Sequence, residues 1–333
     1  MEQTPGLRGL LRSHGGPDRA AHLREDADLL DRLLADAGTR VVAVRGDRVL
    51  VAPVPAHSMA PTADPSPAPA DGVAGALGLV LRSPSAADGG LLAVFLGLHP
   101  GEDGERTAYL GVVEAPTDGD RDAGWQTLRA AGALLPDLDA SLAATLLALA
   151  NWHRSHDRCS RCGAPSEPAS AGWVRRCTRD GSQHFPRTDP SVIMSVIDDD
   201  GRLLLGRGVT WPANQFSVLA GFVEPGESLE AAVAREVLEE SGVVVTEVSY
   251  LGSQPWPFPS SLMLGFTARA VTTALTHDPT EMAEVRWVTR AEYAALLRSG
   301  AIRVPGSISI ARRIIERWLG ADLEVAAGHA VIE

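Results

Sequence analysis

The chain has 333 residues, of which 45% are hydrophobic, so it is long enough for about two globular domains with buried cores. Its formal net charge of −12 argues against a broad nucleic-acid-binding surface. No apolar run approaches the length of a membrane helix, and the first residues lack the apolar core of a secretory signal. The three cysteines fit a reducing compartment better than secretion, so we expect a cytoplasmic protein without a membrane partner.

Residues 1–150 have the pattern of an N-terminal α+β domain. Two valine-rich runs, 41–44 and 49–51, flank a short turn and predict a β-hairpin. Further strands and a closing helix are predicted at 77–81, 91–98, 109–113 and 141–153. The residue pattern of this domain reveals no catalytic constellation.

Residues 151–188 contain all three cysteines and predict a zinc-ribbon-like linker. Cys159 and Cys162 have the C-x2-C spacing of zinc ligands, and Cys177 follows. A fourth cysteine would be expected three residues later, but Asp180 occupies that position. Because a carboxylate oxygen also binds zinc, we expect a structural zinc ion held by the three cysteines and either Asp180 or His184. The alternatives are a lost site with free thiols and a Cys159–Cys162 disulfide.

Residues 189–325 read as a second domain. Strands are predicted at 192–197, 203–205, 248–251, 262–270 and 285–288, and helices at 291–298 and 308–319. A further helix is predicted from Ser228, which is a suitable N-cap, to Ser241, with Gly242 ending it. Leu229, Val233 and Val237 form its apolar stripe.

The same helix carries three glutamates on one polar face. Glu236, Glu239 and Glu240 lie at positions i, i+3 and i+4, so their carboxylates converge. Hard divalent cations such as Mg²⁺ accept oxygen ligands of this kind and also bind substrate phosphates. Any of the three carboxylates is also placed to accept the proton of an attacking water. The alternative is an ordinary solvated acidic face of a helix.

The spacing around these glutamates is G-x5-E-x7-R-E-U-x-E-E-x-G-U, where U is a bulky aliphatic residue. At average residue usage, a chance match in a chain of this length is on the order of one in ten million. The nine residues that make the match are Gly221, Glu227, Arg235, Glu236, Val237, Glu239, Glu240, Gly242 and Val243.

This pattern resembles the box of the Nudix hydrolases, which cut a nucleoside diphosphate linked to another group. The resemblance implies an α/β (α+β) fold, with the box in an α/β/α sandwich built on a mixed sheet. It also implies that Glu236, Glu239 and Glu240 bind Mg²⁺ or Mn²⁺, with Glu240 our first choice for activating water. Arg235 is expected to pair with Glu227 and steady the helix.

A second motif follows the box in the stretch Ser253–Ser261, which reads SQPWPFPSS. Prolines at alternate positions predict a stiff, non-helical loop that presents Trp256 and Phe258, whose faces are suited to stacking on flat bases. The stretch resembles the SQPWPFPxS motif of the NADH pyrophosphatase subfamily, which implies that Gln254, Trp256 and Phe258 recognise a dinucleotide. The alternative is a proline-rich surface turn with its aromatic rings packed inward.

Other segments resemble the same subfamily. The approach to the box places Phe222 to stack on a base, and the small Ala220 lets a ligand come close to the backbone. Glu281 matches a position that completes the metal site, with Glu284 as the fallback and an ordinary loop acid as the alternative. Phe185, in an aromatic-Pro-Arg segment, is expected to line the pocket. The subfamily also has a four-cysteine zinc knuckle between its two domains.

The resemblance implies a homodimeric, metal-dependent hydrolase. Its reaction would be cleavage of the pyrophosphate bond of NADH or NAD⁺ into AMP and reduced or oxidised nicotinamide mononucleotide. Bacterial relatives also remove NAD caps from RNA by cutting the same bond. A Nudix hydrolase that prefers ADP-ribose is the alternative within this class. A non-catalytic dinucleotide sensor is the alternative from another class, but no box glutamate has been lost.

Overall fold

The computed structural model describes residue 7 and residues 16–54, 77–101, 104–118 and 124–328. Within these residues the chain divides into two compact units. The N-terminal unit contains the described residues from 16 to 188 together with residues 256–260. The C-terminal unit contains residue 7, residues 189–255 and the described residues from 261 onward. None of the described helices is both long enough and apolar enough to cross a lipid bilayer.

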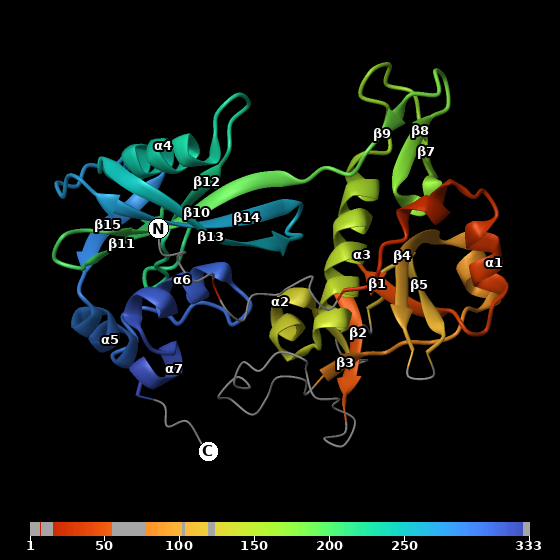
Figure 1. The fold of residues 1–333 in the computed structure, drawn as a ribbon, viewed down its shortest axis with the longest axis horizontal. Helices are drawn as coiled ribbons and strands as arrows, with labels where there is room; N and C mark the ends of the chain where they lie inside the picture. The colour runs from red at the N-terminus through yellow and green to blue at the C-terminus, as the bar shows by residue number, and fades with distance from the viewer. Residues whose placement is uncertain (1–6, 8–15, 55–76, 102–103, 119–123, 329–333) are drawn as a thin grey trace. The chain divides into compact units, whose positions relative to one another are not determined.

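A mixed sheet with the strand order β3-β2-β1-β5-β4 forms the centre of the N-terminal unit (Figure 1), and β6 pairs with β2. Its strands are β1 (Arg40–Arg45), β2 (Arg48–Pro53), β3 (Leu77–Leu79), β4 (Leu92–Pro100), β5 (Arg106–Glu114) and β6 (Trp125–Thr127). The predicted hairpin is confirmed, because β1 and β2 pair antiparallel with Val44 opposite Val49. β1 also pairs in parallel with β5, which makes the sheet mixed.

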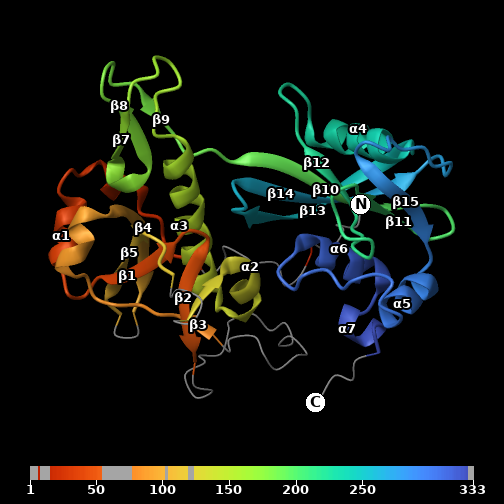
Figure 2. The ribbon, with the colours of Figure 1, turned by 180° about the vertical axis from the view of Figure 1, so that it is seen from behind.

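Different helices cover the two faces of this sheet (Figure 2). α3 (Asp137–Ser155) covers one face and shares a core cluster with Val42. α1 (Leu29–Ala35) covers the other face, where its leucines pack against the cluster that contains Val41. Val41 and Val42 separate in this way because successive residues of a strand point to opposite faces. A short helix, α2 (Leu128–Ala131), follows β6.

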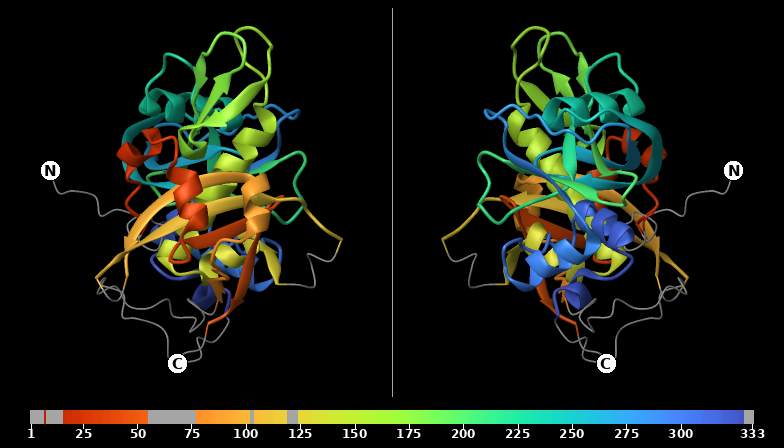
Figure 3. Two further views of the ribbon diagram at one scale, coloured as in Figure 1. Left: turned by 90° about the vertical axis from the view of Figure 1, so that its right-hand side faces the viewer. Right: turned by 90° about the vertical axis from the view of Figure 1, so that its left-hand side faces the viewer.

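A small antiparallel sheet lies beyond the C-terminal end of α3 (Figure 3). Its strands are β7 (Ser166–Ala169), β8 (Val174–Cys177) and β9 (Gln183–His184). Buried His153, near the end of α3, connects to this ribbon through both ring nitrogens. Its Nε2 donates to the carbonyl oxygen of Gly172 at 2.8 Å, and its Nδ1 accepts from Arg175 at 2.9 Å. Burial lowers the pKa of His153, so the neutral ring fixes the ribbon to the helix.

A second mixed sheet, with the order β13-β14-β10-β11-β15, forms the centre of the C-terminal unit, and β12 pairs with β10. Its strands are β10 (Asp189–Ile197), β11 (Leu203–Gly208), β12 (Leu219–Phe222), β13 (Val245–Trp256), β14 (Ser261–Ala270) and β15 (Met282–Val288). β10 pairs in parallel with β14 and antiparallel with β11 and β12. The helices of this unit are α4 (Leu229–Ser241), α5 (Arg290–Arg298), α6 (Ile310–Leu319) and α7 (Leu323–Ala326).

The expected α/β/α sandwich is confirmed in this unit. Val192, on β10, belongs to the core cluster that packs under α4, whereas the next residue, Ile193, belongs to the cluster under α6. Leu204 and Leu205 of β11 divide between the same two clusters. The strands are therefore apolar on both faces, as expected for a sheet covered by helices on both sides.

The SQPWPFPSS stretch differs from the loop that its prolines predict. Residues 253–256 continue β13, which is 12 residues long and ends at Trp256. The prediction overlooked that β13 is the terminal strand in the order of this sheet. Pro255 is tolerated there because an edge strand does not need every N–H group.

Candidate active site

Local sequence determines the helix that carries the box glutamates. The Ser228 hydroxyl accepts a hydrogen bond from the N–H of Ala231 at 3.2 Å and caps the first turn of α4. Gly242 ends the helix with a φ of 73°, and its N–H donates to the carbonyl of Leu238 at 2.8 Å. Val233 and Val237 are fully buried beneath the helix. The helix is thereby fixed at both ends and along its apolar stripe.

Arg235 ties α4 to the loop before it. Its guanidinium group donates twice to Glu227, at 2.6 and 3.1 Å, so the predicted ion pair is present. It also donates to Glu236 at 2.9 Å and to Glu239 at 3.0 Å, and to the carbonyl of Phe222 at 2.9 Å. Hydrogen bonds to Arg235 lower the pKa of Glu227, which keeps this carboxylate charged. One arginine thus balances part of the charge of three acids.

Gly221 leaves room for the carboxylate of Glu236. A Cβ atom at this position would lie 1.8 Å from the carboxyl carbon of Glu236 and about as close to both of its oxygens. Only glycine therefore permits Glu236 to lie against the backbone of β12. Burial raises the pKa of Glu236, while the hydrogen bond and charge of Arg235 oppose that shift.

Glu240 is the most perturbed carboxylate of the box. Its Oε2 atom is buried and has no hydrogen-bond partner among the residues that the structure describes, while the N–H of Ala220 donates to the side chain. Burial, followed by the charge of Glu236, raises the pKa of Glu240 to about 8. The charges of Glu281 and Glu239 act in the same direction. A bound cation would offset both the desolvation and the repulsion.

Glu281 comes near the box from another part of the sheet. It lies just before β15, is exposed, and is close enough for its charge to raise the pKa of Glu240. The fallback residue Glu284 is instead paired with Arg286 at 3.1 Å and with Arg207 at 3.9 Å. Of the two acids, Glu281 is therefore better placed to contribute to a site shared with Glu240.

The carboxylates of Glu236, Glu239, Glu240 and Glu281 offer only oxygen atoms, the kind of ligand that Mg²⁺ and Mn²⁺ prefer. The unpartnered oxygen of Glu240 and the close approach of Glu236 to Gly221 fit an ion at this place. Glu239, which is more than half exposed, is held by Arg235. A bound ion would have to compete with Arg235 for it.

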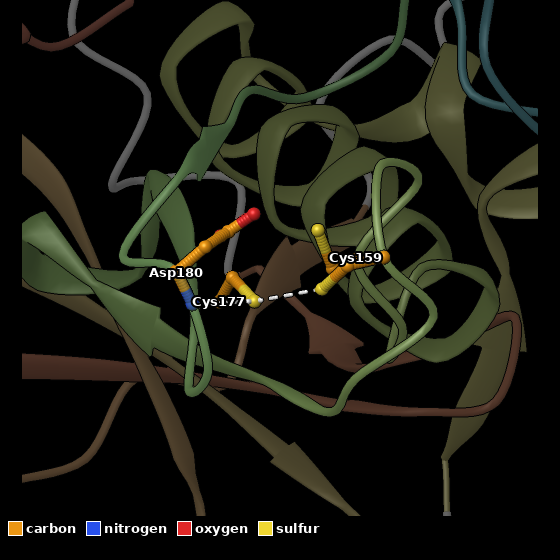
Figure 4. Close-up of side chains that lie close together, drawn as sticks. Cys159, Cys177 and Asp180 are labelled. Atoms are coloured by element: carbon orange, nitrogen blue, oxygen red, sulfur yellow. Dashed lines mark hydrogen bonds between the residues drawn. The ribbon is translucent and has the colours of Figure 1, made fainter.

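The cysteines form a second candidate metal site, in the ribbon. Candidate ligand atoms of Cys159, Cys162, Cys177 and Asp180 all lie within 4.8 Å of one another. Figure 4 shows Cys159, Cys177 and Asp180 close together. All three cysteines are free thiols, so this structure does not contain the alternative Cys159–Cys162 disulfide. Three sulfurs and one carboxylate at this separation suit tetrahedral zinc.

Backbone and hydroxyl donors surround the ribbon sulfurs. The N–H groups of Arg161 and Arg179 point at Cys159 and Cys177, at 3.4 and 3.3 Å. The Ser182 hydroxyl, aided by backbone N–H groups, lowers the pKa of Cys159 to about 6, which favours the thiolate that binds metal. His184 Nε2 lies 3.2 Å from the Cys159 sulfur, so the second candidate for the fourth ligand is also close.

The structure corrects the expectation for Gln254. Its side chain is fully buried, and its amide donates to the carbonyl of Ile308 at 2.6 Å and accepts from the N–H of Ile310 at 2.8 Å. Both polar atoms thus bond to the backbone at the start of α6, and the buried side chain is not exposed to a ligand in this structure. Gln254 anchors β13 to this helix.

The aromatic candidates differ in exposure. Phe222 and Phe185 are 59% and 66% exposed, so both rings are available to a ligand. Trp256 and Phe258 are half-buried and meet edge to face, with ring centroids 5.0 Å apart. Sequence reasoning missed Arg129, whose guanidinium lies over both rings, because it precedes them by more than a hundred residues.

We expect Glu240→Gln to stabilise the metal-free protein in alkaline solution. The raised pKa means that the folded state holds this proton more tightly, so stability falls as pH rises from the ordinary glutamate range through about 8. In the presence of a chelator, the variant should have a Tm higher than wild type by about 2–4 °C at about pH 9 and equal to it near pH 5.

Differential scanning fluorimetry across this pH range measures the effect. Glu224→Gln, at an exposed position in the same loop–helix region, is the matched control and should change Tm little. A Glu240→Gln variant that is less stable than wild type at alkaline pH would refute the account of a destabilising buried charge.

Comparison with known families assigns three consecutive segments. Residues 38–152 match the model of the NADH pyrophosphatase-like rudimentary NUDIX domain. Residues 154–185 match the NADH pyrophosphatase zinc ribbon domain, and residues 187–304 match the NUDIX domain. The cysteine cluster therefore lies in a zinc ribbon, and the box lies in a Nudix domain.

Two named relatives support this assignment. The Mycobacterium tuberculosis protein named NAD-capped RNA hydrolase NudC is 43% identical over 240 residues, which are 69% of this chain and 76% of that protein. Human NAD-capped RNA hydrolase NUDT12 is 41% identical over 197 residues, which are 56% of this chain and 43% of that protein. Among solved structures, a NUDIX hydrolase from Nitrosomonas europaea matches 50% of this chain and 94% of its own, with 23% identity and a TM-score of 0.40.

The chain combines a complete box, a zinc ribbon and a rudimentary Nudix domain. It also covers 76% of the length of a relative that is 43% identical to it. The chain belongs to the NADH pyrophosphatase family of Nudix hydrolases.

Proposed function

We propose that this Nudix hydrolase cleaves the pyrophosphate bond of NADH and NAD⁺, releasing AMP and the reduced or oxidised mononucleotide of nicotinamide. The observation that carries the proposal is the buried, unpartnered oxygen of Glu240 beside Glu236, in a helix whose ends and salt bridges are fixed. A site with this excess of negative charge is suited to divalent cations and, through them, to a diphosphate. The SQPWPFP motif supports a nicotinamide dinucleotide over other diphosphates.

Glu236, Glu239, Glu240 and Glu281 would hold Mg²⁺ or Mn²⁺. The bound ions would neutralise phosphate charge and lower the pKa of the attacking water. Among the protein's own groups, Glu240 is positioned by the N–H of Ala220 and is our candidate to accept the proton of that water. Arg235 and Glu227 act on this step only by fixing α4, and the exposed rings of Phe222 and Phe185 are candidates to stack on a base.

Removal of NAD caps from RNA is a second candidate activity. The relatives from Mycobacterium tuberculosis and human carry that activity in their names. Cap removal breaks the same bond, so the same carboxylates would serve. The net charge of −12 predicts that binding of the RNA body adds little to affinity.

We expect purified protein with Mg²⁺ or Mn²⁺ to convert NADH into AMP and reduced nicotinamide mononucleotide faster than it releases AMP from ADP-ribose. Chromatographic product analysis with NADH, NAD⁺, ADP-ribose and NAD-capped RNA at matched concentrations checks this. Preference for ADP-ribose would leave the Nudix chemistry intact and overturn the assignment of the aromatic motif. Dinucleotide binding without any cleavage would support a sensor.

Glu240→Gln should lower kcat by a factor of about 10²–10⁴, the usual contribution of a positioned acid or base, with a much smaller change in KM. Glu224→Gln is again the control, and it should retain wild-type turnover. Near-normal turnover of Glu240→Gln would remove Glu240 from the mechanism.

We propose that zinc in the ribbon has Asp180 as its fourth ligand. The Asp180 carboxylate lies within 4.8 Å of all three sulfurs, and hydrogen bonds, first from Ser182, keep its pKa low and the group charged. The purified protein should contain about one zinc per chain. Asp180→Ala should lose most of it, and His184→Ala should keep it.

Elemental analysis of the three proteins after dialysis measures the zinc content. The opposite ranking would make His184 the ligand. Wild-type protein with well under one zinc per chain would show that the cysteines hold no structural ion.

The family resemblance also leads us to propose a homodimer in the cytoplasm. Light scattering of the purified chain gives its mass in solution.

A further inference from the structure

The aromatic end of the SQPWPFPSS stretch belongs to the N-terminal unit. Residues 256–260 group with this unit, whereas the residues before and after them group with the C-terminal unit. Phe258 packs against the core cluster formed by α3 and the sheet of the N-terminal unit. We call residues 256–260 the aromatic tip.

One side chain of α3 holds the backbone of the aromatic tip. Asn151 is 9% exposed, and its amide nitrogen donates to the carbonyls of Pro257, at 3.0 Å, and of Pro259, at 3.2 Å. The side-chain Oδ1 of Asn151 accepts a hydrogen bond from the Arg154 guanidinium at 2.8 Å, which fixes the orientation of the amide. Since proline has no N–H, the tip forms few backbone hydrogen bonds of its own, and these two carbonyls depend on a side-chain donor.

A second side chain of the N-terminal unit holds the two rings. The guanidinium carbon of Arg129, in α2, lies 4.1 Å from the ring centroid of Phe258 and 4.9 Å from that of Trp256. The two rings stand at 78° to each other, and one cation contacts both. Burial lowers the pKa of the Arg129 guanidinium, although the residue as a whole is exposed, so each contact has the modest strength of a cation–π pair near solvent.

We infer that Asn151 and Arg129 are positioning residues for dinucleotide recognition, which act through the rings of Trp256 and Phe258. This inference rests on the proposed role of Trp256 and Phe258 in binding a nicotinamide dinucleotide. Neither residue is part of the box, so their effect is on affinity. They act by fixing the backbone and the angle between rings before the ligand arrives, which reduces the entropy lost on binding.

The structural part of the inference is tested without substrate. In protein labelled with 5-fluorotryptophan, Trp256→Phe identifies the fluorine resonance of Trp256. Asn151→Leu and Arg129→Met should each shift or broaden that resonance, and Arg129→Lys, which keeps a cation, should restore it in part. Arg24→Met is the matched control, because the Arg24 guanidinium lies 3.7 Å from the ring of Trp173 in the same unit. It should move the Trp173 resonance and leave that of Trp256 unchanged.

The functional part is tested with NADH. Asn151→Leu and Arg129→Met should each raise the KM for NADH of the metal-loaded enzyme and the Kd for NADH of the metal-free protein. We expect an increase of about threefold to tenfold in each, the value of one or two modest contacts, with kcat within about twofold of wild type. Neither variant should weaken binding further when Trp256 and Phe258 are already alanine, because interacting residues are not additive. Arg24→Met should bind as wild type does.

Two results would overturn the inference. One is an unchanged Trp256 resonance in Asn151→Leu. The other is a loss of NADH affinity on Asn151→Leu or Arg129→Met that is equal whether Trp256 and Phe258 are intact or already alanine. If wild-type protein binds NADH but does not hydrolyse it, the proposed reaction fails and the positioning role stands on the Kd values. If wild-type protein does not bind NADH at all, the role in recognition fails with it.

Discussion

Arg235 joins three acidic side chains and one backbone carbonyl, and these contacts determine where the remaining carboxylates of the site lie. With α4 fixed in this way, Glu236 is pressed against Gly221, and Glu240 is left buried without a charge partner. The arrangement is unfavourable for the metal-free protein, because desolvation and like charges both act against ionised Glu240. A cation bound by the box carboxylates, as proposed, would offset both terms. Stability of the free protein and affinity for metal would then oppose each other at one residue.

In the N-terminal unit, two neutral side chains near the end of α3 hold neighbouring segments in place by hydrogen bonds. Asn151 reaches the aromatic tip, and two residues later His153 reaches the ribbon through Gly172 and Arg175. Because the neutral imidazole both donates and accepts, its tautomer and orientation are set. The last turns of α3 thus contact both the zinc ribbon and the aromatic tip, so this helix fixes both segments.

The sequence predicts those parts of the molecule that depend on local spacing. The box helix, its Ser228 cap and its buried valines follow from residues within one segment, and the structure contains all of them. The hairpin at Val44 and Val49 follows from local alternation in the same way. Gln254 was misjudged because its motif suggested a ligand contact, whereas its amide is used by backbone groups more than fifty residues later. Arg129 had no local signal at all, since its role depends on rings that only the tertiary fold brings to it.

The aromatic motif shows why a domain without a catalytic helix matters to such an enzyme. Its prolines keep the tip from being held by a strand ladder, so its shape must come from side chains elsewhere. Gln254 fixes the strand that leads into the tip, through the start of α6, and Asn151 fixes the tip itself, through α3. Gln254 belongs to the C-terminal unit, whereas Asn151 and the aromatic tip belong to the N-terminal unit. Changes in the N-terminal unit therefore reach the proposed recognition rings through the backbone that Asn151 holds, while the carboxylates on α4 keep their geometry through Arg235.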